Sequence, residues 1–406
     1  MVEELADGRA LVYWFTYDPQ GRQAWTVGVG AHSSTGSNGG TNNRIEISEN
    51  IITSGARFGT AFKAADVVRT RWGSLSLTFA DCNSVDVSYA SPLAGYSGAR
   101  RNGVLLTALA GAACIDGTPA ARTNGSWEEG VAIPAPKQSE HASAVWDGKL
   151  YIMGGIGDAR GFKRFDPASN SWAALPTLPS GRDHHAAFAF DGGIYFTGGA
   201  VERGGDDSTT GFRYDIAANR WDTRPEIIGT FGTHAAVLNG RVFIANPDGS
   251  LQEYDPTQRI TRRLTRALPQ RPRDHSQLVA YMGELWLMGG RLPETNTVAI
   301  YDPVTAQWRT GPPLINRRGG FAANVVGDQI VIAGGEIITA PIRVEPTVEV
   351  FGAGAQAWAL GPNLSVPVHG VTGNVINGRF YLAGGSTTAG TEDGNTGRMF
   401  SIVLRP

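Results

Sequence analysis

The chain has 406 residues, a formal net charge of -2 and a charged fraction of 18%, which argues against disorder. The small net charge gives no reason to expect nucleic acid or an anionic membrane as a partner, and no apolar run approaches the roughly 18 residues of a membrane span. The length exceeds the usual size of one core, and 54 glycines suit tight turns. We therefore expect an all-β protein with one large repeat domain and a smaller one.

The N-terminal residues carry no recognisable export signal. Met1 to Leu5 are acidic and lead directly into an expected strand. Cys82 and Cys114 are the two cysteines, and an even pair in a glycine-rich β domain favours a disulfide, with two free buried thiols as the alternative. A disulfide would indicate a periplasmic or extracellular location, and the sequence would then be trimmed at its N-terminus.

The first part of the chain, residues 1–118, predicts a small antiparallel β-sandwich or half-open barrel. Its expected strands are apolar or alternating runs that are separated by turn-forming residues. They cover residues 9–17, 23–30, 44–48, 73–79, 84–89 and 103–109. Residues 119–125 follow as a linker, so the second domain covers residues 126–406.

This first domain resembles an uncharacterised β domain that is common in bacterial exported proteins. The matching segments are Tyr13–Asp18, Gln23–Trp25, Arg57–Gly59, Asp81–Ser84 and Leu109–Cys114. In that family a glycine-rich strand precedes the position of Leu11, where this chain has Met1 to Gly8. The resemblance implies export and brings no known chemistry.

From residue 126 onward, three marks recur with a spacing typical of a propeller blade. The double glycine falls at Gly154-Gly155, Gly198-Gly199, Gly289-Gly290, Gly334-Gly335 and Gly384-Gly385. An aromatic residue before aspartate falls at Phe165-Asp166, Tyr214-Asp215, Tyr254-Asp255 and Tyr301-Asp302. Tryptophan falls at Trp172, Trp221, Trp308 and Trp358. Two glycines permit a close backbone approach at the end of a strand, and the aromatic residues are expected to fill the space between blades.

These marks resemble the kelch repeat, which implies a six-bladed β-propeller. The third repeat departs from the pattern, because Ala245-Asn246 replaces the glycines and Ile260 replaces the tryptophan. The sixth repeat has no trailing tryptophan strand, whereas Trp127 precedes the first repeat. We expect the Trp127 strand to become the outer strand of the last blade, which would protect a sheet edge from aggregation.

The starts of the inner strands and the loops after the double glycines should share one face of the propeller, around its channel. Six histidines lie near those starts: His141, His184, His185, His234, His275 and His369. A metal would need three or four ligands about 2.0–2.2 Å from one point, and Arg-x-x-His is a common kelch feature, as in Arg182 to His185. We therefore expect no metal and no cofactor. The copper-oxidase branch of kelch proteins needs a cysteine in the propeller, and none follows Cys114.

The same face is rich in arginine, which holds carboxylate or sulfate groups in a bidentate manner. The ligand-binding candidates are Arg182, His184, His185, Asp207, Arg273, His275, Arg317 and Arg318. Mutually neutralising surface pairs are the alternative, since acids such as Glu294 share this face. Six-bladed kelch sialic acid mutarotases pair arginine with glutamate over a sugar, and Glu202 and Glu336, just past a double glycine, are the catalytic candidates that this resemblance implies.

No Ser-His-Asp order, phosphate loop, Cys-x-x-Cys or dinucleotide fingerprint appears in the sequence. His184 and His185 are adjacent on an expected strand beside Asp183, so they should point apart rather than form a relay. The leading functional hypothesis is an exported binding module that presents the loop-lined channel face to a protein or glycan, because a fold alone grants no activity. The alternatives are a carbohydrate-active enzyme of the mutarotase type and a structural cell-surface or adhesion component.

Overall fold

The computed structural model describes residues 2–4, 9–17, 23–33, 43–54, 63, 66–81, 84–93, 99–104, 123–201, 209–264, 273–291 and 293–404. The chain divides into two compact units, one built mainly from residues 1–109 and the other mainly from residues 118–406. None of the described segments is a helix with the length and apolarity that a membrane span requires.

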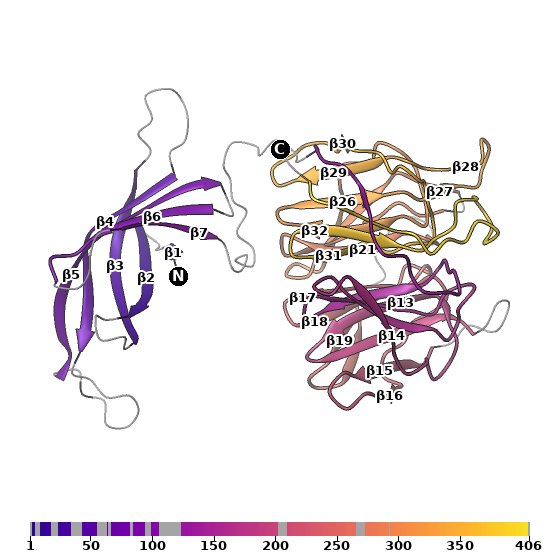
Figure 1. Ribbon diagram of the computed structural model, residues 1–406, viewed down its shortest axis with the longest axis horizontal. Coiled ribbons are helices and arrows are strands. Elements are labelled where there is room, and N and C mark those ends of the chain that lie inside the picture. The colour runs from indigo at the N-terminus through magenta and orange to yellow at the C-terminus, as the bar shows by residue number, and fades with distance from the viewer. Residues whose placement is uncertain are drawn as a thin grey trace. The chain divides into compact units, whose positions relative to one another are not determined.

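The first unit is a single antiparallel sheet in which each described strand pairs with the next one along the chain (Figure 1). Its strands are β1 (Val2–Glu4), β2 (Arg9–Tyr17), β3 (Gln23–Ser33), β4 (Asn43–Ser54), β5 (Val68–Asp81), β6 (Ser84–Ala90) and β7 (Ala99–Val104). The expected antiparallel β domain is confirmed; of its two expected forms, a sandwich or a half-open barrel, the single sheet of the described strands agrees with the second rather than with two facing sheets. Consecutive hairpins explain this, because each connection leads to the adjacent position in the same sheet.

One face of this sheet holds a small apolar core around Val12, Ile45 and Leu75. Trp14 extends the core, and its ring meets the ring of Tyr89 edge-on at 4.7 Å. Cys82 and Cys114 lie outside the described residues, so the disulfide stays a prediction.

The second unit contains six four-stranded antiparallel sheets among its described residues, which confirms the six-bladed propeller. Blades 1 and 2 comprise β9 (Ala142–Trp146), β10 (Lys149–Met153), β11 (Phe162–Asp166), β12 (Ser171–Ala174), β13 (Asp183–Phe190), β14 (Gly193–Ala200), β15 (Gly211–Asp215) and β16 (Arg220–Arg224). Blades 3 and 4 comprise β17 (His234–Leu238), β18 (Arg241–Ala245), β19 (Leu251–Asp255), β20 (Ile260–Arg263), β21 (Gln277–Tyr281), β22 (Glu284–Met288), β23 (Val298–Asp302) and β24 (Gln307–Thr310). The third blade therefore has all four strands although its sequence lacks the double glycine and the tryptophan.

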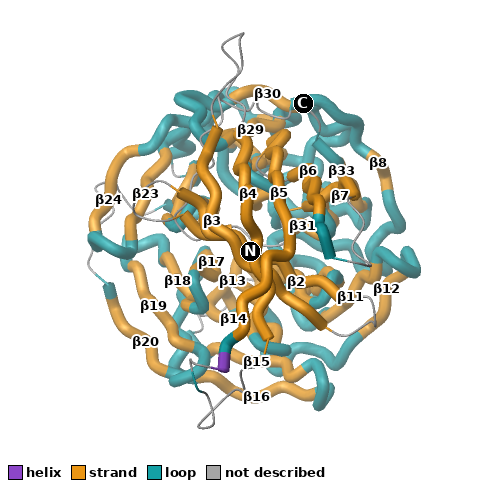
Figure 2. The backbone as a smooth tube through the Cα atoms, turned by 90° about the vertical axis from the view of Figure 1, so that its left-hand side faces the viewer, coloured by secondary structure: helices purple, strands orange, loops and turns teal. Residues whose placement is uncertain are grey.

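Blade 5 comprises β25 (Ala322–Val326), β26 (Gln329–Ala333), β29 (Val348–Gly352) and β30 (Ala359–Gly361), with an additional hairpin of β27 (Glu336–Ile337) and β28 (Arg343–Val344). Blade 6 comprises β31 (Asn374–Ile376), β32 (Arg379–Ala383), β33 (Met399–Ile402) and β8 (Glu128–Glu129). Figure 2 shows the outer strands β8, β12, β16, β20, β24 and β30 at the rim of the ring.

The sixth blade is completed by residues from the start of the propeller. Glu128 and Glu129 pair with Ser401 and Phe400 of β33. The ring of the neighbouring Trp127 packs edge-on against Phe380 at 6.3 Å. The first and last blade segments are thus joined by backbone hydrogen bonds and by an aromatic contact.

Several of the recurring tryptophans join their blade to the one before it. Trp127 Nε1 donates a hydrogen bond to the carbonyl of Pro362, which follows the outer strand of blade 5 (2.8 Å). Trp221 and Trp358 make the corresponding bonds to Pro176 (3.0 Å) and Pro312 (2.9 Å). These three indoles therefore fill the space between two blades and satisfy their polar groups there.

The double glycines allow the start of an inner strand to approach the end of the second strand. Gly155 has φ +102°, and a Cβ at this position would clash with the carbonyl oxygen of Ser139. Gly334 has φ +71°, and a Cβ there would clash with the carbonyl of Val368 in the next blade. At these positions glycine is therefore required, because any larger residue would clash with the neighbouring backbone.

We predict that Trp127→Ser destabilises the propeller by about 3 kcal/mol, because it removes a large packed side chain and leaves the Pro362 carbonyl without its partner. The cooperative thermal transition of the propeller is the measurement. Val304→Ser is the control, since Val304 is 91% exposed. An unchanged transition in Trp127→Ser would show that the β8 segment does not stabilise the ring.

Candidate functional site

A ring of residues with left-handed backbone surrounds the mouth of the channel, one from the start of each blade. We call it the mouth ring. Its members are Glu140 (φ 53°), His184 (φ 53°), Gly232 (φ 71°), His275 (φ 55°), Gly320 (φ 64°) and Gly370 (φ 65°). Three members are glycine, which adopts this conformation without strain, whereas the other three bring functional side chains to the same place.

Main-chain hydrogen bonds connect the mouth ring from blade to blade. The amide of His184 donates to the carbonyl of Glu140 at 3.0 Å, and the amide of Gly232 donates to His184 at 2.8 Å. Further bonds run from Gly320 to His275, from Gly370 to Gly320 and from Glu140 to Gly370. The last of these bonds connects blade 1 to blade 6, so the mouth is defined by backbone as well as by side chains.

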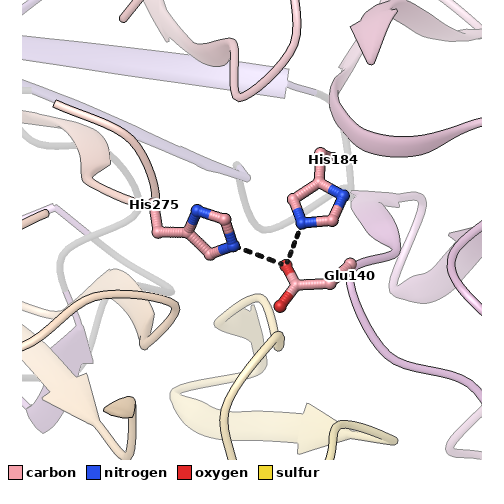
Figure 3. A group of neighbouring side chains, drawn as sticks. All are labelled: Glu140, His184 and His275. Carbon is pink, nitrogen blue, oxygen red and sulfur yellow. Dashed lines mark ion pairs between the residues drawn. The ribbon is translucent and has the colours of Figure 1, made fainter. Parts of the chain in front are cut away.

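Glu140, His184 and His275 converge at the centre of the mouth ring (Figure 3). The Oε2 atom of Glu140 lies 3.7 Å from Nε2 of His184 and 3.5 Å from Nε2 of His275. The other ring nitrogen of each histidine faces the preceding aspartate. Nδ1 of His184 lies 2.7 Å from Asp183 Oδ1, and Nδ1 of His275 lies 2.5 Å from Asp274 Oδ1.

Further ion pairs extend this cluster toward blades 5 and 6. Arg291 Nε lies 3.2 Å from Asp274 Oδ2, and the same guanidinium also contacts Glu336. Glu336 Oε2 lies 3.3 Å from His369 Nδ1, which lies 3.6 Å from Glu140 Oε1. These contacts form a closed circuit of alternating charge that begins and ends at Glu140.

Burial and mutual attraction act in opposite directions on the pKa values of this cluster. Burial raises the pKa of Glu140, but the charges of His275 and His184 outweigh burial and hold it well below its usual range. Burial lowers the pKa of His275, but Glu140 and Asp274 outweigh it and raise the value to about 9. Burial raises the pKa of Asp274, but contacts with His275 and Arg291 lower it to about 2. In the described residues the cluster is thus a set of paired charges.

Two connected spaces lie along the propeller axis. The three converging side chains line a cavity of about 50 Å³ at the mouth. The channel beyond it, about 490 Å³, is lined by alanines of the inner strands and by neutral polar side chains such as Gln277, Asn324 and Thr372. The charged groups are therefore concentrated at the mouth, and the channel offers mainly neutral hydrogen-bonding groups.

Three of the four arginines that were predicted to bind a ligand are buried in the propeller blades. Arg318 Nη1 donates to the carbonyls of Gly334 and Thr347, both at 2.8 Å, and Nη2 lies 2.6 Å from Glu349. Arg273 Nη1 donates in the same way to Thr297 at 3.1 Å, and Arg182 is 1% exposed. Of the four candidate arginines, Arg317 is exposed and the other three are buried, so ligand binding by these arginines stays a prediction.

His141 and His185 line the mouth cavity and also lie against the double glycines of neighbouring blades. A Cβ at Gly154 of blade 1 would be 2.8 Å from Cε1 of His185, and a Cβ at Gly384 of blade 6 would be 3.2 Å from Cε1 of His141. Burial lowers the pKa of His141 to about 4 and that of His185 to about 3. These two histidines are therefore neutral packing groups over the double glycines.

The three acidic candidates Glu202, Asp207 and Glu336 differ in what the structure says of them. Glu202 and Asp207 lie outside the described residues, and Glu336 is fully buried. His184 and His185 point apart as expected, since His184 faces Glu140 and His185 lies against Gly154. The contact of 2.7 Å between His184 Nδ1 and Asp183 Oδ1, where the backbone of His184 is left-handed, was not expected.

Glu140 was not predicted. The available signal is the alignment of Ser139-Glu140-His141-Ala142 with Asp183-His184-His185-Ala186, which gives Glu140 the repeat position of His184.

Comparisons with known proteins agree with this architecture. Residues 137–179 match the family model described as the Kelch motif. Kelch-like protein terF of Aspergillus terreus is 27% identical over 251 residues, which cover 56% of this chain and 45% of that protein. Beta-scruin of Limulus polyphemus is 27% identical over 194 residues, which cover 42% of this chain and 21% of that protein. The chain thus matches less than half the length of these relatives.

The solved structure described as "Structure of YjhT" has a TM-score of 0.58 and 16% identity, and the match covers 68% of this chain and 99% of that one. At this identity the similarity concerns the fold.

We predict that Arg318→Gln destabilises the propeller by roughly 3–5 kcal/mol, because it leaves Glu349 buried without its cation. Arg317→Gln is the matched control and should change stability by less than about 0.5 kcal/mol. Urea denaturation of both variants measures the difference. Equal stabilities would mean that Arg318 is not part of the blade architecture.

We predict that His185→Phe reduces the loss of stability in acid. The folded pKa of about 3 lies below the unfolded value near 6.5, so the unfolded state takes up a proton first as the pH falls. Stability is therefore fully present above pH 6.5 and is lost as the pH falls toward 3. Phenylalanine fits the position, because blade 5 has Phe321 against Gly289 there.

The free energy of unfolding measured between pH 4 and pH 6 should fall less steeply in His185→Phe, by up to about 1.4 kcal/mol per pH unit. Measurements at pH 7.5 give the baseline, where both proteins are neutral at this position. Parallel pH profiles would contradict the packing role.

Proposed function

The chain is a kelch-repeat β-propeller protein, and we propose that it is a binding module whose propeller presents a rigid set of loops to a protein or glycan partner. The binding surface comprises the loops that follow the double glycines in blades 4, 5 and 6. We call residues 293–297, 335–347 and 385–398 the loop ridge. Loops on a rigid scaffold commonly carry recognition in propellers.

Buried carboxylates connect the three loops of the ridge, and this observation carries the proposal. Glu294 of blade 4, which is 5% exposed, accepts a hydrogen bond from the amide of Ile338 in blade 5 at 2.7 Å. Glu336 of blade 5, which is fully buried, accepts one from the amide of Gly390 in blade 6 at 2.7 Å. The loops of blades 5 and 6 are thereby each fixed by a charged group of the blade before.

The ridge exposes an apolar tip. In blade 5, β27 and β28 pair through Glu336 with Val344 and Ile337 with Arg343, and this hairpin lies beside the loop that follows β32 (Figure 1). At its tip Ile342 is 66% exposed, next to the exposed Arg343. An apolar side chain beside a cation on a fixed hairpin suits recognition with little loss of conformational entropy.

The mutarotase-type alternative has less support from the described residues. Such an enzyme needs arginine and an available carboxylate over the sugar. Glu336 already contacts Arg291, His369 and the Gly390 amide, and the three candidate arginines other than Arg317 are buried in their blades. The extracellular or periplasmic location stays a prediction.

We predict that Ile342→Asp lowers partner binding at least about tenfold. The measurement is binding of the purified protein to a glycan array and to an array of extracellular proteins. Val304→Asp is the matched control, because Val304 lies in the β23–β24 turn at the opposite end of blade 4 and should have no effect.

Two outcomes would contradict this function. One is equal binding by the Ile342→Asp and Val304→Asp proteins. The other is an NMR experiment in which the protein accelerates anomer exchange of an acidic sugar above the buffer rate, which would favour the enzyme. Strong self-association through the ridge without other ligands would favour the structural or adhesion role.

A further inference from the structure

We propose that Glu140, His184 and His275 form a binding site for one divalent transition-metal ion, with Zn²⁺ as the expected class, at the mouth of the propeller channel. The three ligands come from blades 1, 2 and 4, and each occupies the left-handed position of the mouth ring. This site is separate from the loop ridge and does not depend on the proposed binding function.

The spacing of the donor atoms suits a metal. One carboxylate oxygen and two imidazole nitrogens lie within 4.8 Å of one another. Bonds of about 2.0–2.1 Å in a tetrahedral site place ligand atoms roughly 3.3 Å apart. Glu140 Oε2 lies 3.5 Å from His275 Nε2 and 3.7 Å from His184 Nε2, so small side-chain movements suffice.

The orientation of both histidines also points to a metal. Each presents Nε2 toward Glu140, while Nδ1 faces the carboxylate of the preceding aspartate, at 2.7 Å in His184 and 2.5 Å in His275. In His184, Nδ1 is hydrogen-bonded to Asp183, and such a carboxylate fixes the tautomer that leaves Nε2 as a metal ligand and raises the basicity of the ring. In His275, Nδ1 lies close to Asp274 Oδ1 without forming a hydrogen bond to a described residue. Phe231 stacks on the His184 ring at 4.4 Å and restricts its rotation.

The cluster contains a buried nitrogen that forms an ion pair but no hydrogen bond with a described residue. The side chain of His275 is 2% exposed, and its Nε2 makes no hydrogen bond with any described residue. The Nε2 of His234, which lines the same cavity, likewise has no hydrogen-bond partner in the described part of the chain. Polar atoms buried in this way are unfavourable unless a ligand or ion completes them. The cavity of about 50 Å³ leaves room for a water molecule on the metal.

The donor set selects the class of ion. Imidazole nitrogens with one carboxylate suit Zn²⁺ and related first-row ions, whereas Mg²⁺ and Ca²⁺ prefer sites made of oxygen atoms. The ligands connect three blades across the mouth, so bound metal should stabilise the ring against opening. The competing interpretation is that Glu140 simply forms ion pairs with the two histidines.

The test uses the full chain without an affinity tag, dialysed against EDTA and then titrated with Zn²⁺ by calorimetry and with Co²⁺ by visible absorption. We expect one ion per chain, d–d absorption bands from Co²⁺ and no saturable binding of Mg²⁺. A hundredfold excess of Zn²⁺ over its Kd should raise the melting temperature by roughly 5 °C.

Variants separate the two interpretations. Glu140→Gln and His275→Gln should weaken Zn²⁺ binding more than about 100-fold, and Asp183→Asn, which acts on the orientation of His184, about 10–100-fold. Glu129→Gln removes a half-exposed carboxylate at the rim and should leave the Kd unchanged.

Melting curves in EDTA establish that each variant is folded. If Glu140→Gln does not fold, His184→Gln replaces it as the ligand variant. The proposal is overturned if the unmodified chain binds no Zn²⁺ stoichiometrically, or if folded ligand variants bind Zn²⁺ as tightly as the unmodified chain does.

Discussion

The mouth ring is the constraint on which the centre of this propeller depends. Each blade contributes one residue with a φ between 53° and 71°, and five main-chain hydrogen bonds among the described residues join neighbouring members of this ring. A left-handed conformation costs a non-glycine residue roughly 1 kcal/mol or more, so it persists only where the surrounding structure requires it. At three positions glycine removes this cost. At the other three the strained backbone aims Glu140, His184 and His275 at a common point.

The architecture of the propeller could be predicted because its signals are local, steric and repeated. A double glycine is required wherever a neighbouring carbonyl approaches within contact distance of the backbone, as at Gly155 and Gly334. The indoles of Trp127, Trp221 and Trp358 bridge two blades through the same carbonyl position, which gives the recurring tryptophan a structural reason. The number of sheets in the first unit was harder to predict, because a hairpin pattern defines neighbouring strands but not whether the sheet folds over on itself.

The side chains at the mouth were harder to predict than the blades that carry them. The sequence placed the histidines near the inner strands, but their directions depend on a backbone conformation that residue type does not reveal. His184 and His185 are consecutive, yet one ring faces the cavity and the other packs on a glycine of the preceding blade. The chemistry of an arginine at the start of a blade suggests anion binding. Arg318 instead donates its hydrogen bonds to a carbonyl and a carboxylate of its own blade. A single sequence does not distinguish an arginine that binds a ligand from one that holds its own blade together.

The pairing of β8 with β33 has a consequence for how the protein is made. Glu129 contacts Arg398, a residue 269 positions later in the chain. During synthesis the first blades can form as soon as they leave the ribosome, but β8 is translated before them and lacks its partner β33 until almost the entire propeller has been made. Such a distant contact is slow to form, so nascent chains expose an unpaired edge for most of their synthesis. The protein is therefore more exposed to aggregation during this interval than after the ring has closed. A chaperone or a neighbouring chain segment could cover the unpaired edge in the meantime.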